Sequence, residues 1–396
     1  MSDGLANIPA FGNNLPVKVR FGEGIANSLP DAIAEVGASQ VFLIVDAGIE
    51  TFNPAAAELL HNLASSGTNV TRFDKPAGEP TIQMVDDAIA ALGAARCDAV
   101  VALGGGSVID TAKAARLCAQ LGVSFREFAA AAPVYPTPTI PLIAIPTSAG
   151  TGSEVSGGSV ISDPDAGRKA GIANANLRAQ IALVDPRLTY SMPPSMTAHT
   201  GIDALAQAIA AIIAKCNTPI GNGIAYEAIR MMTPALVAAY RDGNDVAARA
   251  AMSAGSMMAG LSMNISDCTA EHSLGQAIGG LAHVPHGLTI GLVLVETLTR
   301  EATIVPEAME RVADAMGEPD DGSGDGTRAV RAVSRILAQL DFPVLSSLGF
   351  TSDDVDKLAD LALADFFITQ APAPWSKDEV VAAFNAALAL ESRPAS

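Results

Sequence analysis

The chain has 396 residues, more than a single hydrophobic core usually organises, so two domains are expected. Apolar residues make up 49% of the chain and charged residues 17%, which is typical of a globular protein with a large interior. The 24 Lys and Arg against 42 Asp and Glu give a net charge of −18, which argues against nucleic acid or an anionic membrane as a partner.

The cysteines and the N-terminus favour a cytoplasmic protein. The four cysteines are widely spaced, with no CxxC pair, and are expected to be reduced thiols. The first residues, MSDGLANIPAFGNN, lack the basic and apolar regions of a signal peptide. Apolar runs such as Leu288–Val295 are too short to span a bilayer.

The first half alternates between two kinds of segment. Ala- and Leu-rich helical stretches near 54–67, 82–95 and 107–121 separate short β-branched runs, which lie at 17–21, 40–46, 69–73, 98–103, 141–147 and 181–185. This alternation predicts βαβ units and a parallel sheet covered by helices on both faces. We therefore expect an α/β, Rossmann-like domain over residues 1–190.

The sequence pattern changes after Pro193 from alternating strands and helices to helices alone. Helical patterns cover 201–214, 220–241, 246–282, 287–303, 306–316, 325–340, 352–364 and 376–391, and none of these segments reads as a strand. An all-α domain is expected over residues 191–396. The acidic, glycine-rich stretch 318–327 is expected to be a solvated, mobile loop.

A glycine-rich turn follows the predicted strand at 98–103. Gly104, Gly105, Gly106 and Ser107 open the next helix, whose unpaired N–H groups and positive dipole end can bind a phosphate. The sequence is neither a GxGxxG fingerprint nor a Walker A loop, and a plain tight turn between strand and helix is an equal alternative.

A second polar loop, 146–156, follows the strand at 141–147. It contains Thr147, Ser148, Thr151 and Ser156, whose hydroxyls suit a pyrophosphate or an amide-bearing ring, although such a loop can also satisfy itself. Two loops of this kind after two strands of one sheet favour a dinucleotide across the carboxyl ends of the strands. Asp46, at the end of the strand 40–46, can accept from ribose hydroxyls or serve as a turn residue.

Polar residues interrupt the apolar helical segment 201–214 at two positions only. Asp203 and Gln207 stand four residues apart and therefore share one face of a helix. His272 lies in a second helical pattern and His286 at the start of a third. Two imidazoles and a carboxylate suit Zn²⁺ or Fe²⁺, but core or capping histidines that meet no metal are the alternative.

Taken together, GGGSVIDTAKA, PTSAGTGSEVS, Lys169, LVDPRLT, GIDALAQA and His272…PHG resemble the iron-containing (group III) alcohol dehydrogenase family over nearly the whole chain. The resemblance implies an NAD(P)-binding N-terminal domain, a helical metal-binding domain and substrate in the cleft between them. Gly104–Ser107 match the pyrophosphate loop, and the hydroxyls of Thr147, Ser148, Thr151 and Ser156 match residues around the cofactor. Asp46 matches the carboxylate that favours NAD over NADP, and Lys169 matches a lysine near the cofactor.

The resemblance also shows departures at the metal site. Asp203, His272 and His286 match three ligands of the family, but Gln207 and Gln276 replace two common histidines, the first a ligand and the second linked to proton relay. Gln207 either binds the metal through its amide oxygen, or three ligands suffice as in zinc-dependent glycerol dehydrogenases, or the metal is lost or weakly held. His199 either replaces the relay or faces solvent. Glu79 stands where an asparagine is common.

The expected function is metal-assisted hydride transfer between a small, uncharged or weakly polar alcohol and NAD, in a homodimer or larger homo-oligomer. Two alternatives stay open. The chain could be a non-catalytic, metal-free NAD-binding homologue, or a lyase of the dehydroquinate synthase type.

Overall fold

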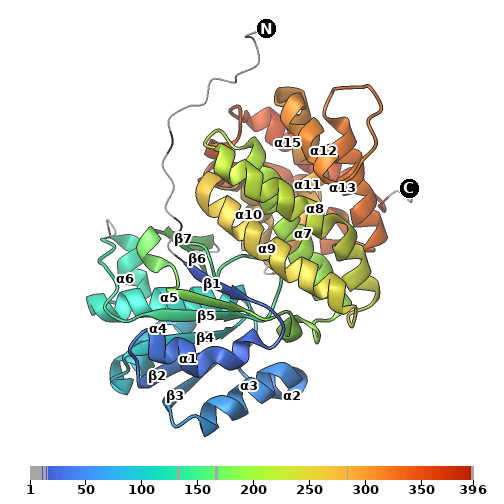
Figure 1. Cartoon of the computed structure of the whole chain (residues 1–396). Helices are drawn as coiled ribbons and strands as arrows, with labels where there is room; N and C mark the ends of the chain where they lie inside the picture. Colours follow the sequence, from blue (N-terminus) through green and yellow to red (C-terminus); the bar gives the residue numbers. More distant parts are fainter. Residues whose placement is uncertain are drawn as a thin grey trace.

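The computed structural model describes residues 11, 15, 17–131, 134–165, 168–282 and 284–393. The N-terminal stretch for which the sequence predicts no signal peptide lies almost wholly outside these residues. Figure 1 shows a sheet-containing part, coloured blue to green, against a helical part coloured yellow-green to red. The predicted combination of an α/β half and a helical half is confirmed.

Six parallel strands form the main sheet in the order β1-β8-β5-β4-β2-β3. Their bounds are β1 (Lys18–Phe21), β2 (Gln40–Asp46), β3 (Asn69–Lys75), β4 (Ala99–Gly104), β5 (Leu142–Pro146) and β8 (Ile181–Val184), which confirms all six predicted strands. The chain proceeds outward from β2 to β3 on one side and from β4 to β5 and β8 on the other. The switch point between β2 and β4 is where open α/β sheets bind ligands, beyond the carboxyl ends of the strands.

Both faces of the sheet are buried because its strands are apolar at successive positions. In β2, Val41, Leu43 and Val45 pack with one set of helices, whereas Phe42 and Ile44 pack with the other. The first set is α1 (Leu29–Glu35) and α3 (Pro54–Ser65), and the second is α4 (Ile82–Ala95) and α5 (Gly106–Leu121). Two short helices, α2 (Ile49–Phe52) and α6 (Phe125–Ala130), complete this half.

An antiparallel hairpin, β6 (Gly158–Asp163) and β7 (Arg168–Ala173), stands apart from the main sheet. The strands predicted from the sequence do not include this hairpin. In the hairpin Ser162 lies opposite Lys169, and β7 contacts α10 (Ala270–Ala282) of the helical half. The hairpin therefore carries Lys169 to the boundary between the two halves.

The helical half has no strand among the described residues after 191. Its helices are α7 (Pro194–Ile213), α8 (Pro219–Arg241), α9 (Val246–Ser266), α10 (Ala270–Ala282), α11 (His286–Ile304), α12 (Pro306–Ala315), α13 (Thr327–Gln339), α14 (Val355–Leu363) and α15 (Lys377–Ala389). The predicted single helix over 246–282 is wrong, because Asp267 adopts a φ of 61° and ends α9. The predicted start at 201 is also late, since α7 begins at Pro194, a favoured first helical residue.

Helix α7 is long and apolar enough to span a bilayer by length and composition. However, 83% of its most apolar window is buried inside the protein, against α8, α9 and α11. Helix α7 is therefore the central core helix of this half.

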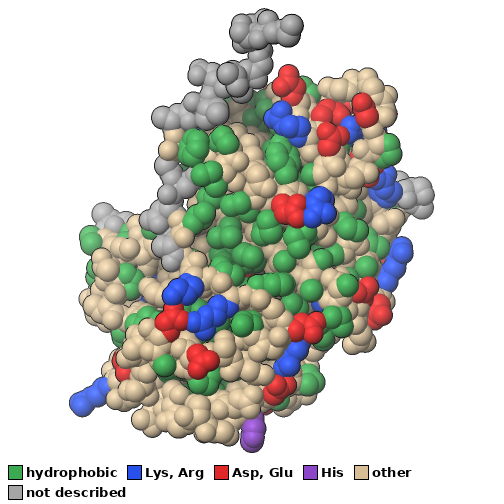
Figure 2. Space-filling view, in the orientation of Figure 1, with side chains coloured by type: hydrophobic (Ala, Val, Ile, Leu, Met, Phe, Trp, Pro, Cys, Tyr) green, Lys and Arg blue, Asp and Glu red, His purple; other side chains and the backbone are tan. Residues whose placement is uncertain are grey.

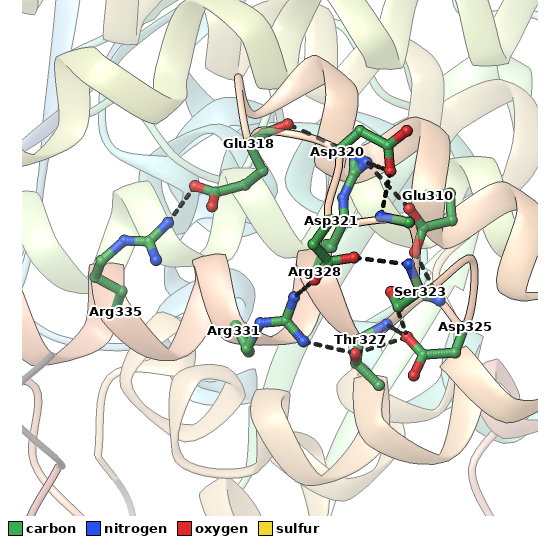
Figure 3. A network of polar contacts seen from close by, with 12 residues as sticks. Glu310, Glu318, Asp320, Asp321, Ser323, Asp325, Thr327, Arg328, Arg331 and Arg335 are labelled. Atoms are coloured by element: carbon green, nitrogen blue, oxygen red, sulfur yellow. Dashed lines mark hydrogen bonds and ion pairs between the residues drawn. The ribbon is translucent and has the colours of Figure 1, made fainter.

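The acidic loop 318–327 is exposed over most of its length, as predicted, but arginines of α13 contact it throughout (Figure 3). Arg331 pairs with Asp321, and Arg335 pairs with Glu318. Arg328 is buried, and its guanidinium lies 3.8 Å from the carboxylate of Asp320 in the loop. These ion pairs compensate the loop's negative charge from within the chain.

A buried charged cluster joins α5, the loop 146–156 and β6. Lys113 is fully buried and donates to the Ser153 hydroxyl at 2.7 Å and to the Gly158 carbonyl at 2.6 Å. Asp110 accepts from the Val160 amide at 2.9 Å. Glu154 lies in the same cluster, and burial raises its pKa to about 7 although Lys113 opposes this.

The pKa of Glu154 predicts a pH-dependent stability. A pKa raised from 4.5 to about 7 means that the folded state binds a proton more tightly than the unfolded state, so stability falls as pH rises from 5 to 8, by about 3 kcal/mol at most. Glu154→Gln removes this loss, so its melting temperature is expected to exceed that of the wild type increasingly toward pH 8 in thermal unfolding.

The control is Glu227→Gln on the surface of α8, where Arg230 lowers the pKa of the carboxyl. Removing the negative charge of Glu227 is therefore not expected to raise the melting temperature toward high pH. If the melting temperatures of Glu154→Gln and wild type differ by the same amount at pH 5 and pH 8, Glu154 is already ionised in the folded protein at pH 5.

Candidate metal and cofactor site

Helix α7 presents a polar pair on an otherwise apolar surface. Asp203 is 1% exposed and Gln207 is 3% exposed, and the residues around them on α7 belong to the hydrophobic core. A buried carboxylate costs several kcal/mol unless a cation or hydrogen-bond donors compensate it. The partners of Asp203 are therefore the starting point for the site.

Two histidines meet Asp203 from α10 and α11. The Nε2 atom of His272 lies 3.5 Å from Oδ1 of Asp203, and Nε2 of His286 lies 3.7 Å from the same oxygen. This approach depends on Gly287, where an added Cβ would lie 2.2 Å from the His199 carbonyl oxygen of α7. The small residue after His286 thus allows α11 to begin directly against α7.

Glu271 fixes the orientation of the His272 ring. Its Oε1 lies 2.7 Å from Nδ1 of His272, and it also accepts from the Thr269 amide at 3.1 Å. When the imidazole is neutral, a carboxylate on Nδ1 favours the tautomer with a proton there, which leaves a lone pair on Nε2 toward Asp203. Glu271 was not predicted from the sequence, although a carboxylate directly before a candidate histidine ligand was a usable signal.

The protonation of the three groups reflects both burial and mutual charge. Burial lowers the pKa of His286 to about 4 although Asp203 opposes it. Burial raises the pKa of Asp203, but the charges of His286 and His272 outweigh it, so the pKa is lowered. Burial also works against a charged His272, yet Cys268, Asp203 and Glu271 together raise its pKa well above the usual value.

Three buried atoms at this site have no hydrogen-bond partner within the part of the chain that the structure describes. They are Oδ1 of Asp203, Oε1 of Gln207 and Nε2 of His272. Buried polar atoms without partners are rare and costly. Ligand atoms of Asp203, His272 and His286 also lie within 4.8 Å of one another, so this donor set fits one divalent cation.

The predicted glycine-rich turn lies at the N-terminus of α5. Gly105 is the N-cap and no side chain caps the helix, so its first N–H groups are free to bind an anion. Packing already requires two of the glycines: a Cβ on Gly104 would lie 2.5 Å from Val108, and one on Gly106 would lie 2.6 Å from Oγ1 of Thr151. Ser107 lies in the first turn of α5 and lines the cavity described below.

The hydroxyl loop 146–156 covers this turn and joins the two halves. A Cβ on Gly105 would lie 3.4 Å from the Ser148 hydroxyl. On the other side of the loop a Cβ on Gly152 would lie 2.3 Å from the Cα of Gly260 in α9, so the loop and α9 are in backbone contact. The loop is thus positioned by both halves.

Asp46 lies at the switch point of the sheet. Its Oδ2 atom is 2.9 Å from the position that a Cβ on Gly104 would take, and its carboxylate accepts from the Gly105 amide. Burial raises the pKa of Asp46, and Lys75 opposes this. Asp46, at the end of β2, and Gly104, at the end of β4, are therefore adjacent.

One cavity of about 790 Å³, counted with its open mouth, connects the two halves. It is lined by Gly106, Ser107, Thr151, Ser156 and Lys169 from the α/β half and by Asp203, Gln207, His272, Gln276 and His286 from the helical half. Asp46, Gly104, Gly105, Thr147 and Ser148 lie outside its lining, at the carboxyl edge of the sheet. Glu79 lines the cavity and binds Lys169 at 3.0 Å.

The side chain of His199 does not line this cavity. Its ring packs edge-on against Phe342, with ring centroids 5.5 Å apart. It is half-buried, and burial lowers its pKa. Its backbone carbonyl lies against Gly287 of α11.

Two family models cover most of the chain. The model for iron-containing alcohol dehydrogenase matches residues 16–186, and that for the C-terminal part of the Fe-containing alcohol dehydrogenase family matches residues 197–388. The chain belongs to the iron-containing alcohol dehydrogenase family. It is 33% identical over 375 residues to the probable alcohol dehydrogenase EutG of Escherichia coli (strain K12), covering 94% of each chain.

Solved structures of the family have the same fold. A 1,3-propanediol oxidoreductase shares 28% identity with a TM-score of 0.91, over 96% of this chain and 100% of that one. A sulfoacetaldehyde reductase from Bifidobacterium kashiwanohense in complex with NAD⁺ shares 26% identity with a TM-score of 0.87, over 97% and 100%. The protein is an alcohol oxidoreductase of this family, and these relatives do not support the lyase alternative.

The unpartnered Oε1 of Gln207 leads to a prediction about metal affinity. Gln207→Leu removes that donor and is expected to weaken Zn²⁺ and Fe²⁺ binding at least about tenfold, whereas Gln207→His, which supplies an imidazole, is expected to restore or exceed wild-type affinity. Dissociation constants are measured by chelator competition on apo-protein. Gln276→Leu, at the same cavity but outside the donor set, is the matched control; wild-type affinity in Gln207→Leu would identify a three-ligand site.

Proposed function

We propose that the protein catalyses reversible hydride transfer between a small primary alcohol, or its aldehyde, and NAD, assisted by one divalent metal ion, Fe²⁺ or Zn²⁺. One observation carries the proposal. Asp203, Gln207 and His272 each have a potential metal-ligand atom without a hydrogen-bond partner among the described residues. These three side chains line the same cavity as residues of the glycine turn and the hydroxyl loop. A metal site and a dinucleotide site that share a cavity can place the substrate oxygen and the hydride acceptor together.

The cofactor is proposed to lie across the switch point of the sheet. The free N-terminus of α5 suits its pyrophosphate, with Gly104, Gly105, Gly106 and Ser107 around it. Hydroxyls of Thr147, Ser148, Thr151 and Ser156 and the ammonium of Lys169 supply further donors. Asp46 would accept from the adenosine ribose and would repel a 2′-phosphate, which favours NAD over NADP.

The metal is proposed to be held by Asp203, Gln207, His272 and His286. A divalent ion there would act as a Lewis acid on the substrate oxygen. Glu271 keeps the His272 lone pair directed at the site. Because Gln276 is an amide it cannot accept a proton at neutral pH, so the alcohol proton leaves through water or a ribose hydroxyl; His199, directed at Phe342, is not used in this proposal.

We further propose a cytoplasmic homodimer or larger homo-oligomer with no nucleic-acid or membrane partner. The net charge of −18 argues against polyanionic partners. Figure 2 shows apolar side chains gathered over the helical part of one face, where a second copy would bury them.

Asp203→Ala tests the metal-assisted reaction. The variant loses the central carboxylate, and kcat for ethanol or 1-propanol with NAD⁺ is expected to fall about a thousandfold, followed as NADH absorbance with added Fe²⁺ or Zn²⁺. NAD⁺ binding, measured by calorimetry, should change little because Asp203 lies outside the proposed cofactor contacts. Undiminished turnover by the metal-free variant would refute the proposed role of the metal.

Asp46→Asn tests the cofactor preference. The amide keeps the shape of the carboxylate but removes its charge, so the ratio of kcat/KM for NADP⁺ over NAD⁺ is expected to rise at least about tenfold. Steady-state kinetics with both cofactors at one alcohol concentration measures this ratio. An unchanged ratio would place the 2′-hydroxyl away from Asp46.

A further inference from the structure

Lys169 is the one lysine or arginine among the described residues that line the cavity and the smaller hollow beside it. The hollow holds about 630 Å³ and shares Lys169 and Gln276 with the main cavity. The Lys169 side chain is 7% exposed, and its Cε lies 3.7 Å from the position of a Cβ on Gly279 of α10. A cation this well buried beside a substrate cavity would attract an anionic group strongly if nothing neutralised it.

Glu79 neutralises that cation. Its Oε2 atom lies 3.0 Å from Nζ of Lys169, and its side chain is 37% exposed. The loop that carries Glu79 is fixed to the same hairpin as Lys169, because the Ser162 amide donates to the Pro80 carbonyl at 2.7 Å and Thr81 forms a bridge with Ser162. Since Ser162 pairs with Lys169 in the hairpin, carboxylate and ammonium are held in register before any ligand binds.

The hollow adds a second carboxylate and no further cation among the described residues. Asp365 lines it and accepts from the Ser273 hydroxyl at 2.6 Å and from the Phe367 amide at 2.9 Å. The remaining wall is apolar or neutral, formed by Gln276, Ala277, Gly280, Leu361 and Ala364. With Lys169 paired, this wall has no net positive charge for an anionic substrate to meet.

We propose that Glu79 is a specificity-determining residue that excludes substrates with a carboxylate or sulfonate group, by occupying Lys169 and adding its own negative charge to the cavity wall. The inference rests on the proposed alcohol and aldehyde chemistry of the same cavity. Neutral substrates need no charged partner and are unaffected by the pair. Anionic substrates would have to displace a preformed ion pair or approach an unpaired carboxylate.

Glu79→Gln tests this proposal because it keeps the size and hydrogen bonding of the side chain but releases the charge of Lys169. We expect the ratio of kcat/KM for succinic semialdehyde over butanal, with NADH, to rise at least tenfold, which corresponds to about 1.4 kcal/mol. The double variant Glu79→Gln/Lys169→Gln should return the ratio to near the wild-type value, because the gain requires the released ammonium. A purely structural ion pair would change both substrates alike and leave the ratio constant.

A binding measurement keeps the test independent of turnover. Calorimetry with the unreactive pair butyrate and butanamide is expected to show butyrate binding about tenfold tighter to Glu79→Gln than to wild type, with butanamide unchanged. If wild type reduces no aldehyde but butyrate binding rises, the proposed function fails and the charge selection stands. The proposal is overturned if Glu79→Gln changes neither the kcat/KM ratio nor the affinity for butyrate relative to butanamide. It is also overturned if Glu79→Gln tightens the binding of NADH alone, because Lys169 would then serve only the cofactor.

Discussion

The burial of Asp203 within the central helix of the helical half is the constraint on which the site depends. A carboxylate that is 1% exposed requires compensation, and His272 and His286 supply it incompletely because Oδ1 of Asp203 still has no hydrogen-bond partner among the described residues. Helices α10 and α11 must approach α7 closely to bring the two imidazoles there. The contact of Gly287 with the His199 carbonyl allows that approach, and the same packing places the site at the boundary with the α/β half.

Buried contacts hold the loops of the α/β half in place against the helical half. The hydroxyl loop packs on the α5 turn at Thr151 and on α9 at Gly152, while Lys113 ties its Ser153 hydroxyl to β6. The position of these loops relative to Asp203 is therefore set by buried contacts, among them the backbone contact of Gly152 with Gly260 and the hydrogen bonds of Lys113. A chemistry that depends on the distance between a hydride acceptor and a substrate oxygen benefits from such a fixed arrangement.

Much of the fold was predictable because its signals are local. The apolar run of β2 and the helical pattern of α5 each decide their own structure, and all six strands of the main sheet followed from such runs. The break between α9 and α10 was missed because only the backbone conformation of Asp267 marks it. Residue type alone pointed to Asp203, His272 and His286 as candidate ligands, and Glu271 could have been inferred from its place directly before His272. The Lys169–Glu79 pair and the orientation of His199 instead depend on packing between distant segments, which spacing does not encode.

The central claim is that Asp203, Gln207, His272 and His286 bind one divalent ion through oxygen and nitrogen. X-ray absorption spectroscopy of the purified holo-protein, combined with metal analysis, tests it most directly. We predict one ion per chain, with two imidazole nitrogens and at least one further oxygen in its first coordination shell. An ion coordinated by sulfur, which would indicate Cys268, or a protein that binds no stoichiometric metal, would contradict the account.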